Sequence, residues 1–167
     1  AHARALVYWY RRQHALASEC GEELRQRDLL AYVTLERQRL YHDLGASEPR
    51  LANRVPAATA DLVSLALERY DQQASDRNRQ ALVRTVVLAG RVFAYCQLAH
   101  ETSPTGCQYQ EAEQRTTQLL ASRAKLGEVY RYVKLGAVQE LDGEWERKRE
   151  VLTPNAVAEL AQLFAPE

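Results

Sequence analysis

The sequence predicts an all-α protein, built as a bundle of five to six helices with a long helix at its start. Three observations support this fold class. Apolar residues recur at intervals of three and four over long stretches, as one face of a helix requires. Prolines are few and lie outside these stretches or in their first turn. The chain of 167 residues is 46% hydrophobic and 26% charged, which suits a single helical domain over residues 1–167.

The first predicted helix covers residues 3–44, which contain no proline and one glycine, Gly21. A straight helix of this length, roughly 60 Å at ~1.5 Å per residue, outruns a compact monomer and favours a partner helix. Gly21 could divide it, because glycine costs about 1 kcal/mol inside a helix. We therefore expect self-association as a homodimer, and the residues expected at the interface are Tyr8, Trp9, Tyr10, Leu16, Leu24, Leu30, Val33 and Leu40.

Residues 56–135 are predicted to hold the central helices. A second helix is expected from Pro56 to about residue 73, and a third over residues 79–100. The third is apolar around nearly its whole circumference, which is typical of the central helix of a bundle. Gly90 in this helix either allows a neighbouring helix to approach closely or is merely tolerated. A fourth helix is expected over residues 108–135.

Residues 137–165 are predicted to form the C-terminal helices. The segment 137–151 is helix or β-hairpin, because Asp142–Gly143 is a favoured two-residue turn. Its high Glu and Arg content favours helix. The last helix begins with Thr153 as N-cap and Pro154 in its first turn. A short α-solenoid of helix pairs is the alternative architecture, although the sequence shows no fixed repeat period.

The charge balance excludes some classes of partner. With 22 basic and 22 acidic side chains, the chain has no net charge, so we expect no nucleic-acid partner. No apolar run of the length of a transmembrane helix occurs, so we expect no transmembrane segment. The aromatic residues Tyr8, Trp9 and Tyr10 stand just before Arg11 and Arg12. This order is typical of the cytoplasmic end of a membrane helix, and it predicts either a membrane-proximal domain or an ordinary amphipathic helix start.

The stretch CQLAHETSPTGC, from Cys96 to Cys107, has three interpretations. Antiparallel helices joined by a short loop would bring the two cysteines to disulfide distance, which implies a periplasmic or exported protein. Alternatively, Cys96 and His100 share one helical face and, with Cys107, could hold a metal or line a small-molecule pocket. In the third interpretation Cys96 is simply a small buried residue, and free thiols favour the cytoplasm.

The sequence gives little indication of a catalytic site. The chain contains no Glu-x-x-His pair for a bundle metal centre, no phosphate-binding loop and no glycine-rich nucleophile elbow. Helical carboxylates are plentiful, but charged faces of helices are normally solvated. We therefore expect no catalytic residue and no cofactor.

One segment, LERQRLYHDLG at residues 35–45, resembles the first dimerisation helix of sensor histidine kinases. The matching residues, in that family's Glu-Arg-x-Arg-Leu-x-x-Asp-Leu run, are Glu36, Arg37, Arg39, Leu40, Asp43 and Leu44. The resemblance implies a signalling helix that pairs with a second copy. It implies no kinase activity, because Gly45 stands at the phospho-acceptor position and Ala46 at the next acidic one.

Together these observations predict a non-catalytic helical sensor, adaptor or regulatory module that binds a protein partner or itself. The alternative function is a small-molecule or metal-binding helical domain with its pocket near Cys96, His100 and Cys107.

Overall fold

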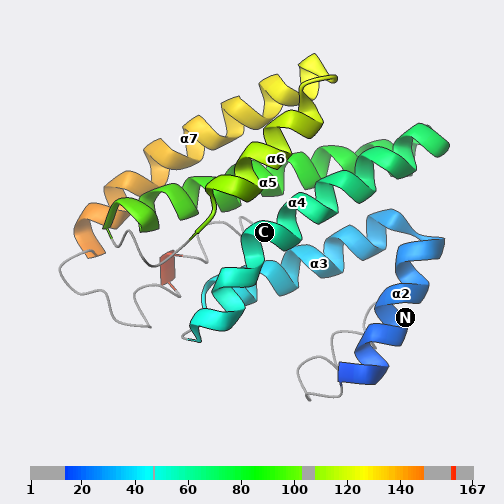
Figure 1. Cartoon of the computed structure of the whole chain (residues 1–167), viewed down its shortest axis with the longest axis horizontal. Coiled ribbons are helices and arrows are strands. Elements are labelled where there is room, and N and C mark those ends of the chain that lie inside the picture. The colour runs from blue at the N-terminus through cyan, green and yellow to red at the C-terminus, as the bar shows by residue number, and fades with distance from the viewer. Residues whose placement is uncertain (1–13, 47, 103–107, 149–158, 161–167) are drawn as a thin grey trace.

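A computed structural model describes residues 14–46, 48–102, 108–148 and 159–160, with the backbone alone for residues 14–20. These residues form six helices and no strand, so the predicted all-α bundle is confirmed (Figure 1). One large core cluster draws buried side chains from α3 to α7 and includes Leu160, which is 1% exposed.

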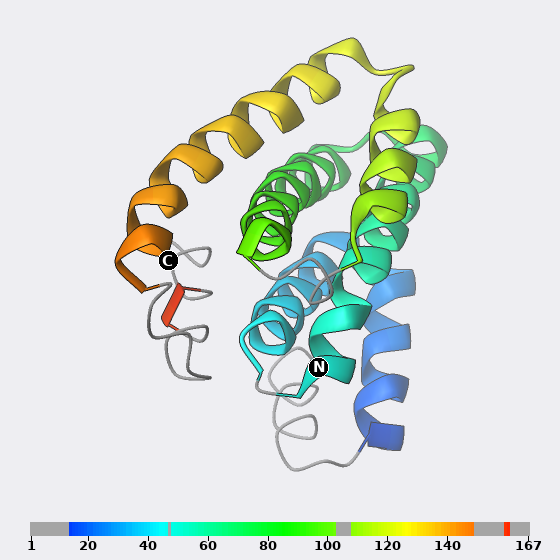
Figure 2. The ribbon, with the colours of Figure 1, turned by 60° about the vertical axis from the view of Figure 1, so that its left-hand side comes forward.

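Helix α5, Asp76–Thr102, is the centre of the bundle, as its apolar composition predicts. It packs against α3 (Leu29–Leu44), α4 (Pro49–Gln72) and α7 (Ala124–Lys148), which lie around it in Figure 2. Its fully buried side chains include Val86, Val92, Phe93 and Cys96. By length and composition α5 could also cross a membrane, although 72% of its apolar stretch is buried inside the bundle.

The long first helix is divided, and the predicted point of division is wrong. Helix α2 (His14–Arg27) contains Gly21, and the break lies at Asp28, before α3 begins. Asp28 has an extended backbone, and its Oδ1 accepts a hydrogen bond of 3.3 Å from the Ala31 N–H. The same carboxylate pairs with Arg77 of α5 at 2.7 Å. A cap and an ion pair compensate for the interrupted helix at Asp28, whereas Gly21 offers no such partners.

Helix α4 begins at Pro49, earlier than the predicted start at Pro56. Pro49 occupies the first turn, where its missing N–H and its fixed φ cost nothing. Pro56 lies inside the helix and is buried. The helix continues through it because the following turn is anchored in the core, where the Thr59 hydroxyl donates to the Val55 carbonyl at 2.7 Å.

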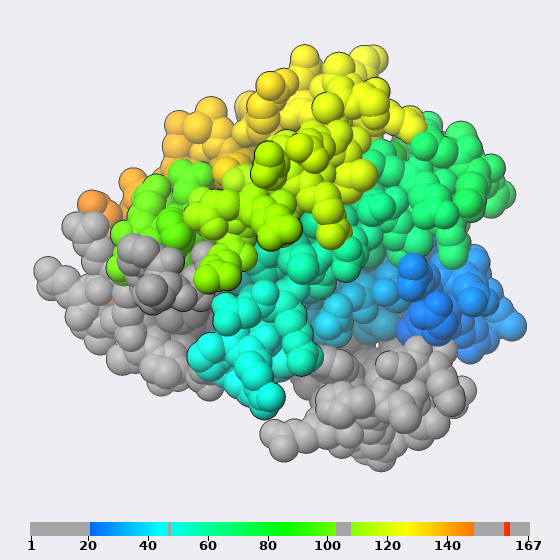
Figure 3. Space-filling model, viewed as in Figure 1, coloured from blue at the N-terminus to red at the C-terminus, as the bar shows by residue number. Residues whose placement is uncertain are grey.

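The predicted fourth helix is two helices. Helix α6, Gln110–Leu120, lies against α4, as the space-filling view also shows (Figure 3). A turn at residues 121–123 then reverses the chain into α7, which covers α5. At this turn the Arg123 side chain pairs with Asp71 of α4. The reversal lets one stretch of chain cover two different helices, which a single straight helix could not do.

Helix α7 continues to Lys148, so most of the ambiguous segment 137–151 is helix and the hairpin alternative is wrong there. Leu141 and Trp145 anchor its second half in the core. The Trp145 indole N–H donates to the Thr102 hydroxyl at 2.5 Å, and its ring meets Tyr95 edge-on at 5.6 Å. The predicted last helix, with Thr153 and Pro154, lies outside the described residues apart from a helical turn at residues 159–160.

Candidate functional site

The structure places Cys96 in the core rather than on an open face. Its side chain is 0% exposed, in the part of α5 that packs against α7. His100, one turn later, has its Nε2 atom 3.2 Å from the Gln110 side-chain nitrogen, and its Nδ1 atom is buried without a hydrogen-bond partner among the described residues. Cys107 lies outside the described residues, so the disulfide and the metal site that include it stay predictions.

The surroundings of Cys96 are aromatic. The Phe93 ring lies 6.5 Å from that of Tyr109 and 6.4 Å from that of Tyr130, and His100 meets Tyr109 edge-on at 5.9 Å. These rings join the end of α5 to the start of α6 and the middle of α7. The packing makes this region part of the core, which fits the interpretation of Cys96 as a small buried residue.

A partly buried polar cluster lies beside these rings. The Glu113 carboxylate accepts hydrogen bonds from the Tyr130 hydroxyl and from Lys134, whose Nζ is 2.5 Å away. The pKa of Tyr130 is raised far above its usual value. Burial is the larger cause, and the neighbouring Glu113 carboxylate is the second. Tyr130 therefore keeps its proton at neutral pH and acts as a donor that links α6 to α7.

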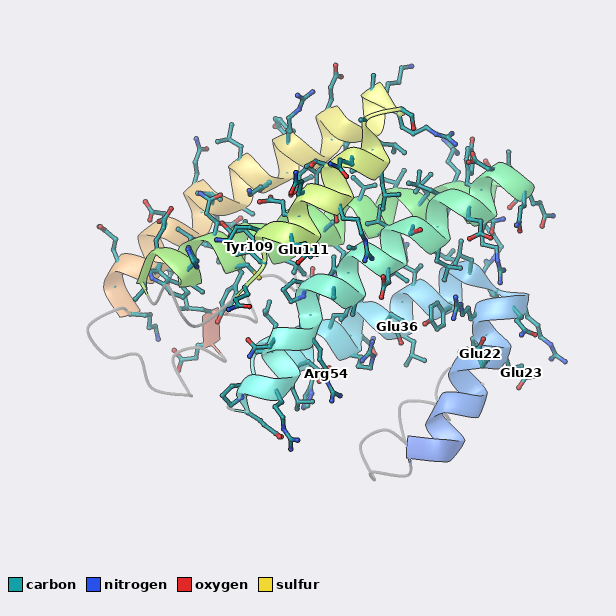
Figure 4. The ribbon with its side chains drawn as sticks, viewed as in Figure 1. Glu22, Glu23, Glu36, Arg54, Tyr109 and Glu111 are labelled. Carbon is teal, nitrogen blue, oxygen red and sulfur yellow. The ribbon has the colours of Figure 1, made fainter. Side chains whose placement is uncertain are left out.

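The helical carboxylates that the structure describes lie apart from one another. Among the described residues, no group of three or more His, Cys, Asp or Glu side chains could hold a metal ion. Figure 4 shows the reason for several of them: Glu111 stands with Tyr109 at the start of α6, while Glu22 and Glu23 lie on α2 and Glu36 on α3.

The predicted interface on the first helix is used inside the chain wherever the structure describes its side chains. Val33 and Leu40 are 0% and 1% exposed and belong to the main core. Leu24 packs with Leu35 in a small second cluster, and Leu30 is half-buried against the core. Within a single chain α2 packs on α3, and α3 packs on α4 and α5, so these side chains take part in internal packing. Their place at an interface between copies stays a prediction. Tyr8, Trp9, Tyr10 and the side chain of Leu16 lie outside the described residues.

The run that resembles a histidine kinase helix also has an internal role here. Leu40 and Leu44 are core residues, and Asp43 is buried beside them. The Arg39 guanidinium pairs with Glu36 at 2.5 Å and with Asp43 at 3.6 Å. Burial alone would lower the pKa of Arg39. The neighbouring Glu36 and Asp43 carboxylates outweigh burial and raise that pKa, so Arg39 stays charged. The charges of Glu36, Arg39 and Asp43 thus compensate one another within α3.

A polar groove of about 400 Å³ lies between α2, α3 and α4. Its wall includes Arg25, Tyr32, Glu36, Arg39 and Asp61. Burial, with the charge of Glu36, raises the pKa of Tyr32 to about 12. Arg39 is already paired with Glu36, and Arg25 lies 3.8 Å from Glu22. With both signs of charge paired locally, this groove has no clear preference for a charged ligand.

A second groove, of about 140 Å³, lies between α3 and α5, which are neighbours in Figure 2. We call it the arginine groove, and its lining residues are Arg37, Tyr41, Val83, Arg84, Val87, Leu88 and Arg91. It continues along α5 into a shallower hollow that shares Val83 and Arg84. No carboxylate is found among the described residues that line the arginine groove.

Two of its arginines are held by Tyr41. The Arg37 guanidinium lies over the Tyr41 ring, with its central carbon 5.6 Å from the ring centroid. Burial raises the pKa of Tyr41, and the nearby Arg37 and Arg91 oppose that rise. Arg84 is exposed two turns before Arg91 on α5, and Val83 beside it keeps 41% of its surface in solvent. The groove therefore offers fixed positive charge around an exposed apolar side chain.

Sequence reasoning missed the arginine groove because its residues come from two helices 40 residues or more apart in the chain. The spacing of Val83, Val87 and Arg91 along one face of α5 was visible, but the all-apolar pattern of that helix hid it. Arg37 was noticed only as part of the kinase-like run.

No protein-family model, no curated protein sequence and no solved structure matches this chain.

Proposed function

We propose that this chain is a non-catalytic helical adaptor or regulatory module that binds an acidic segment of a partner protein in the arginine groove. The observation that supports this function is the composition of the groove, with arginines and no carboxylate among the described residues around a partly exposed valine. Binding in this groove would have an electrostatic part and an apolar part.

The electrostatic part concerns the three guanidinium groups of Arg37, Arg84 and Arg91. Guanidinium groups bind carboxylates with two parallel hydrogen bonds, and such bonds are stronger than those between neutral groups. Arg37 and Arg91 are already oriented by Tyr41, so less side-chain entropy is lost when a ligand binds. Because the whole chain has no net charge, this local excess would direct an acidic partner to one face.

The apolar part concerns Val83 and Val87, which stand one turn apart on α5 above the buried Leu88. An apolar side chain of the partner can pack on these valines while its neighbouring carboxylates reach the arginines. An amphipathic helix with acidic residues beside its apolar stripe has this arrangement. A simple polyanion has the carboxylates or phosphates but no apolar side chain for the valines, so it should bind more weakly than such a segment.

The test is a binding experiment with two designed peptides. One is a short amphipathic helix with leucines flanked by glutamates, and the other has lysines in place of the glutamates. We expect the acidic peptide alone to shift the NMR methyl signals of Val83 and Val87. Equal shifts with both peptides, or none with either, would contradict the proposal. Stronger binding of RNA or of anionic lipid vesicles than of the acidic peptide would also overturn it.

Variants make the test specific. Arg84→Glu should weaken binding of the acidic peptide about tenfold or more, because a favourable charge pair becomes a repulsive one. Arg54→Glu makes the same change of charge on an exposed residue of α4 outside the groove (Figure 4), and it should leave the affinity nearly unchanged. Similar losses in both variants would show that only the net charge of the molecule matters.

A further inference from the structure

We propose that the outer face of α7 is a self-association surface, on which two copies of this chain pair through antiparallel α7 helices. This inference concerns a different surface from the arginine groove and does not depend on it. We call the surface the outer stripe, and its residues are Lys125, Glu128, Tyr132, Leu135, Gln139, Asp142 and Glu146.

The first observation is exposure. Every residue of the outer stripe is exposed, and Tyr132 and Leu135 keep 81% and 60% of their surface in solvent. With Val83 they are the exposed large hydrophobic residues of the described chain. Helix α7 lies at an edge of the molecule in both ribbon views, with α5 on its inner side (Figures 1 and 2). These two side chains place an apolar spot at the middle of an otherwise polar helix face, and a partner that packed on it would remove that apolar surface from water.

The second observation is the spacing of the stripe. Its residues are spaced at intervals of three and four, so they lie along one face of α7, with the two apolar members Tyr132 and Leu135 at its centre. The inner face of α7, with Tyr130, Leu141 and Trp145, is already occupied by the core. The two faces explain why apolar residues occur around so much of this helix.

The third observation identifies the occupant as a second copy. A two-fold axis between Val133 and Lys134 places Lys125 opposite Asp142 of the other copy, and Tyr132 opposite Leu135. It also places Glu128 opposite Gln139. Opposite charges and apolar groups therefore meet in the antiparallel arrangement. A parallel arrangement in register would stack Lys125 on Lys125 and Glu128 on Glu128, which is repulsive.

Two glycines leave room for the second helix. Gly136 and Gly143 follow Leu135 and Asp142 in the chain, and a Cβ atom added to either would meet nothing within 4 Å. Each costs about 1 kcal/mol of helix stability relative to alanine and gains no packing within this chain. Their absence of side chains would let the partner helix lie close to the outer stripe.

The interface of one helix is small, so the expected dimer is weak and depends on concentration. Sedimentation equilibrium should give an average mass that rises from 19.0 kDa toward twice that value as the protein is concentrated. Leu135→Asp should raise the dissociation constant more than ~tenfold, because the burial of one leucine is lost. A wild-type chain that stays monomeric throughout would overturn the proposal.

Exchange of two charges tests the antiparallel register. Lys125→Asp alone and Asp142→Lys alone should each weaken the dimer, because each places like charges opposite one another. The double variant should restore wild-type affinity. In a parallel dimer the double variant would recover nothing, and that result would refute the antiparallel arrangement.

Arg84→Glu serves as the control at a distant surface, since Arg84 lies in the arginine groove. It should not change the dimer. A dimer that is lost in Arg84→Glu but kept in Leu135→Asp would assign self-association to the arginine groove instead. Far-ultraviolet circular dichroism should be unchanged in all these variants, because each substituted residue is exposed.

Discussion

Gly90 sets how closely α5 and α7 can pack. A Cβ atom at this position would lie 2.8 Å from Cγ1 of Val133 and 3.2 Å from the backbone nitrogen of Lys134. The second contact is with backbone, which cannot move without shifting α7. Of the two roles that the sequence allowed for this glycine, close approach of a neighbour is therefore the one observed.

We predict that Gly90→Ala destabilises the protein by about 1–3 kcal/mol, the usual cost of overpacking a core. Urea denaturation followed by circular dichroism measures this change in the free energy of unfolding. In the double variant with Val133→Ala, part of the loss should be recovered, because the side chain that clashes has been shortened.

Gly21→Ala is the matched control for that substitution. Gly21 is also inside a helix, but an added Cβ atom would meet nothing within 4 Å. Helix propensity then dominates, and a gain of up to about 1 kcal/mol is expected. Equal effects at the two glycines would disprove the close-packing role of Gly90.

At the scale of single residues, the sequence also shows which side chains carry charge but not which of them meet. Glu113 was one carboxylate among many, and its partners Tyr130 and Lys134 are 17 and 21 residues away. Such a contact depends on where the chain reverses between α6 and α7. The same holds for the arginine groove, whose positive charge is assembled from α3 and α5.

At the scale of elements, the boundary between α2 and α3 depends on Asp28. Burial alone would raise the pKa of Asp28, but the hydrogen bond from Arg77, with the Ala31 N–H, lowers it overall. A carboxyl whose pKa is lowered by folding stabilises the protein above its unfolded pKa of about 4, and the effect is lost as the pH falls through the folded value.

We predict that Asp28→Ala lowers the free energy of unfolding by about 1–2 kcal/mol at pH 7, since the helix cap and the ion pair are both lost. Below the folded pKa of Asp28, the difference between variant and wild type should shrink. Arg77→Ala removes only the ion pair and should cost less, because that pair is largely exposed. Equal costs for the two variants at pH 7 would contradict the capping role.

Other boundaries show why elements are harder to place than to detect. The sequence located every described helical region by its apolar spacing, but Pro56 and the absence of a strong breaker at residues 121–123 misled the assignment of ends. A glycine or proline inside a helix costs only about 1–3 kcal/mol of helix stability relative to alanine. At Pro56 the burial of neighbouring α4 side chains outweighs this cost, and at residues 121–123 the turn lets α7 pack on α5.

At the scale of the whole molecule, stability should be distributed from the centre outward. Helix α5 contacts α3, α4 and α7, whereas α2 packs mainly on α3 through a small separate cluster. Regions with few buried contacts open with a small free energy, and regions in the centre open only when the whole protein unfolds.

We therefore predict that the backbone amides of α5 exchange with deuterium most slowly, and that those of α2 exchange at least about tenfold faster. A tenfold difference in exchange rate corresponds to about 1.4 kcal/mol in opening free energy. Hydrogen exchange followed by mass spectrometry measures both helices in one experiment. Similar protection in α2 and α5 would show that α2 is part of the central folding unit.

The sequence by itself determined the helical fold class, the central position of the most apolar helix and the lack of net charge, because each follows from composition or from periodicity within one segment. The tertiary structure decided what the apolar stripes are for. Val33 and Leu40 are interior because α3 is flanked by α4 and α5, and Tyr132 and Leu135 are exposed because α7 turns its other face to α5. Periodicity specifies that a helix has an apolar face, and only the packing of all the helices specifies which faces remain uncovered.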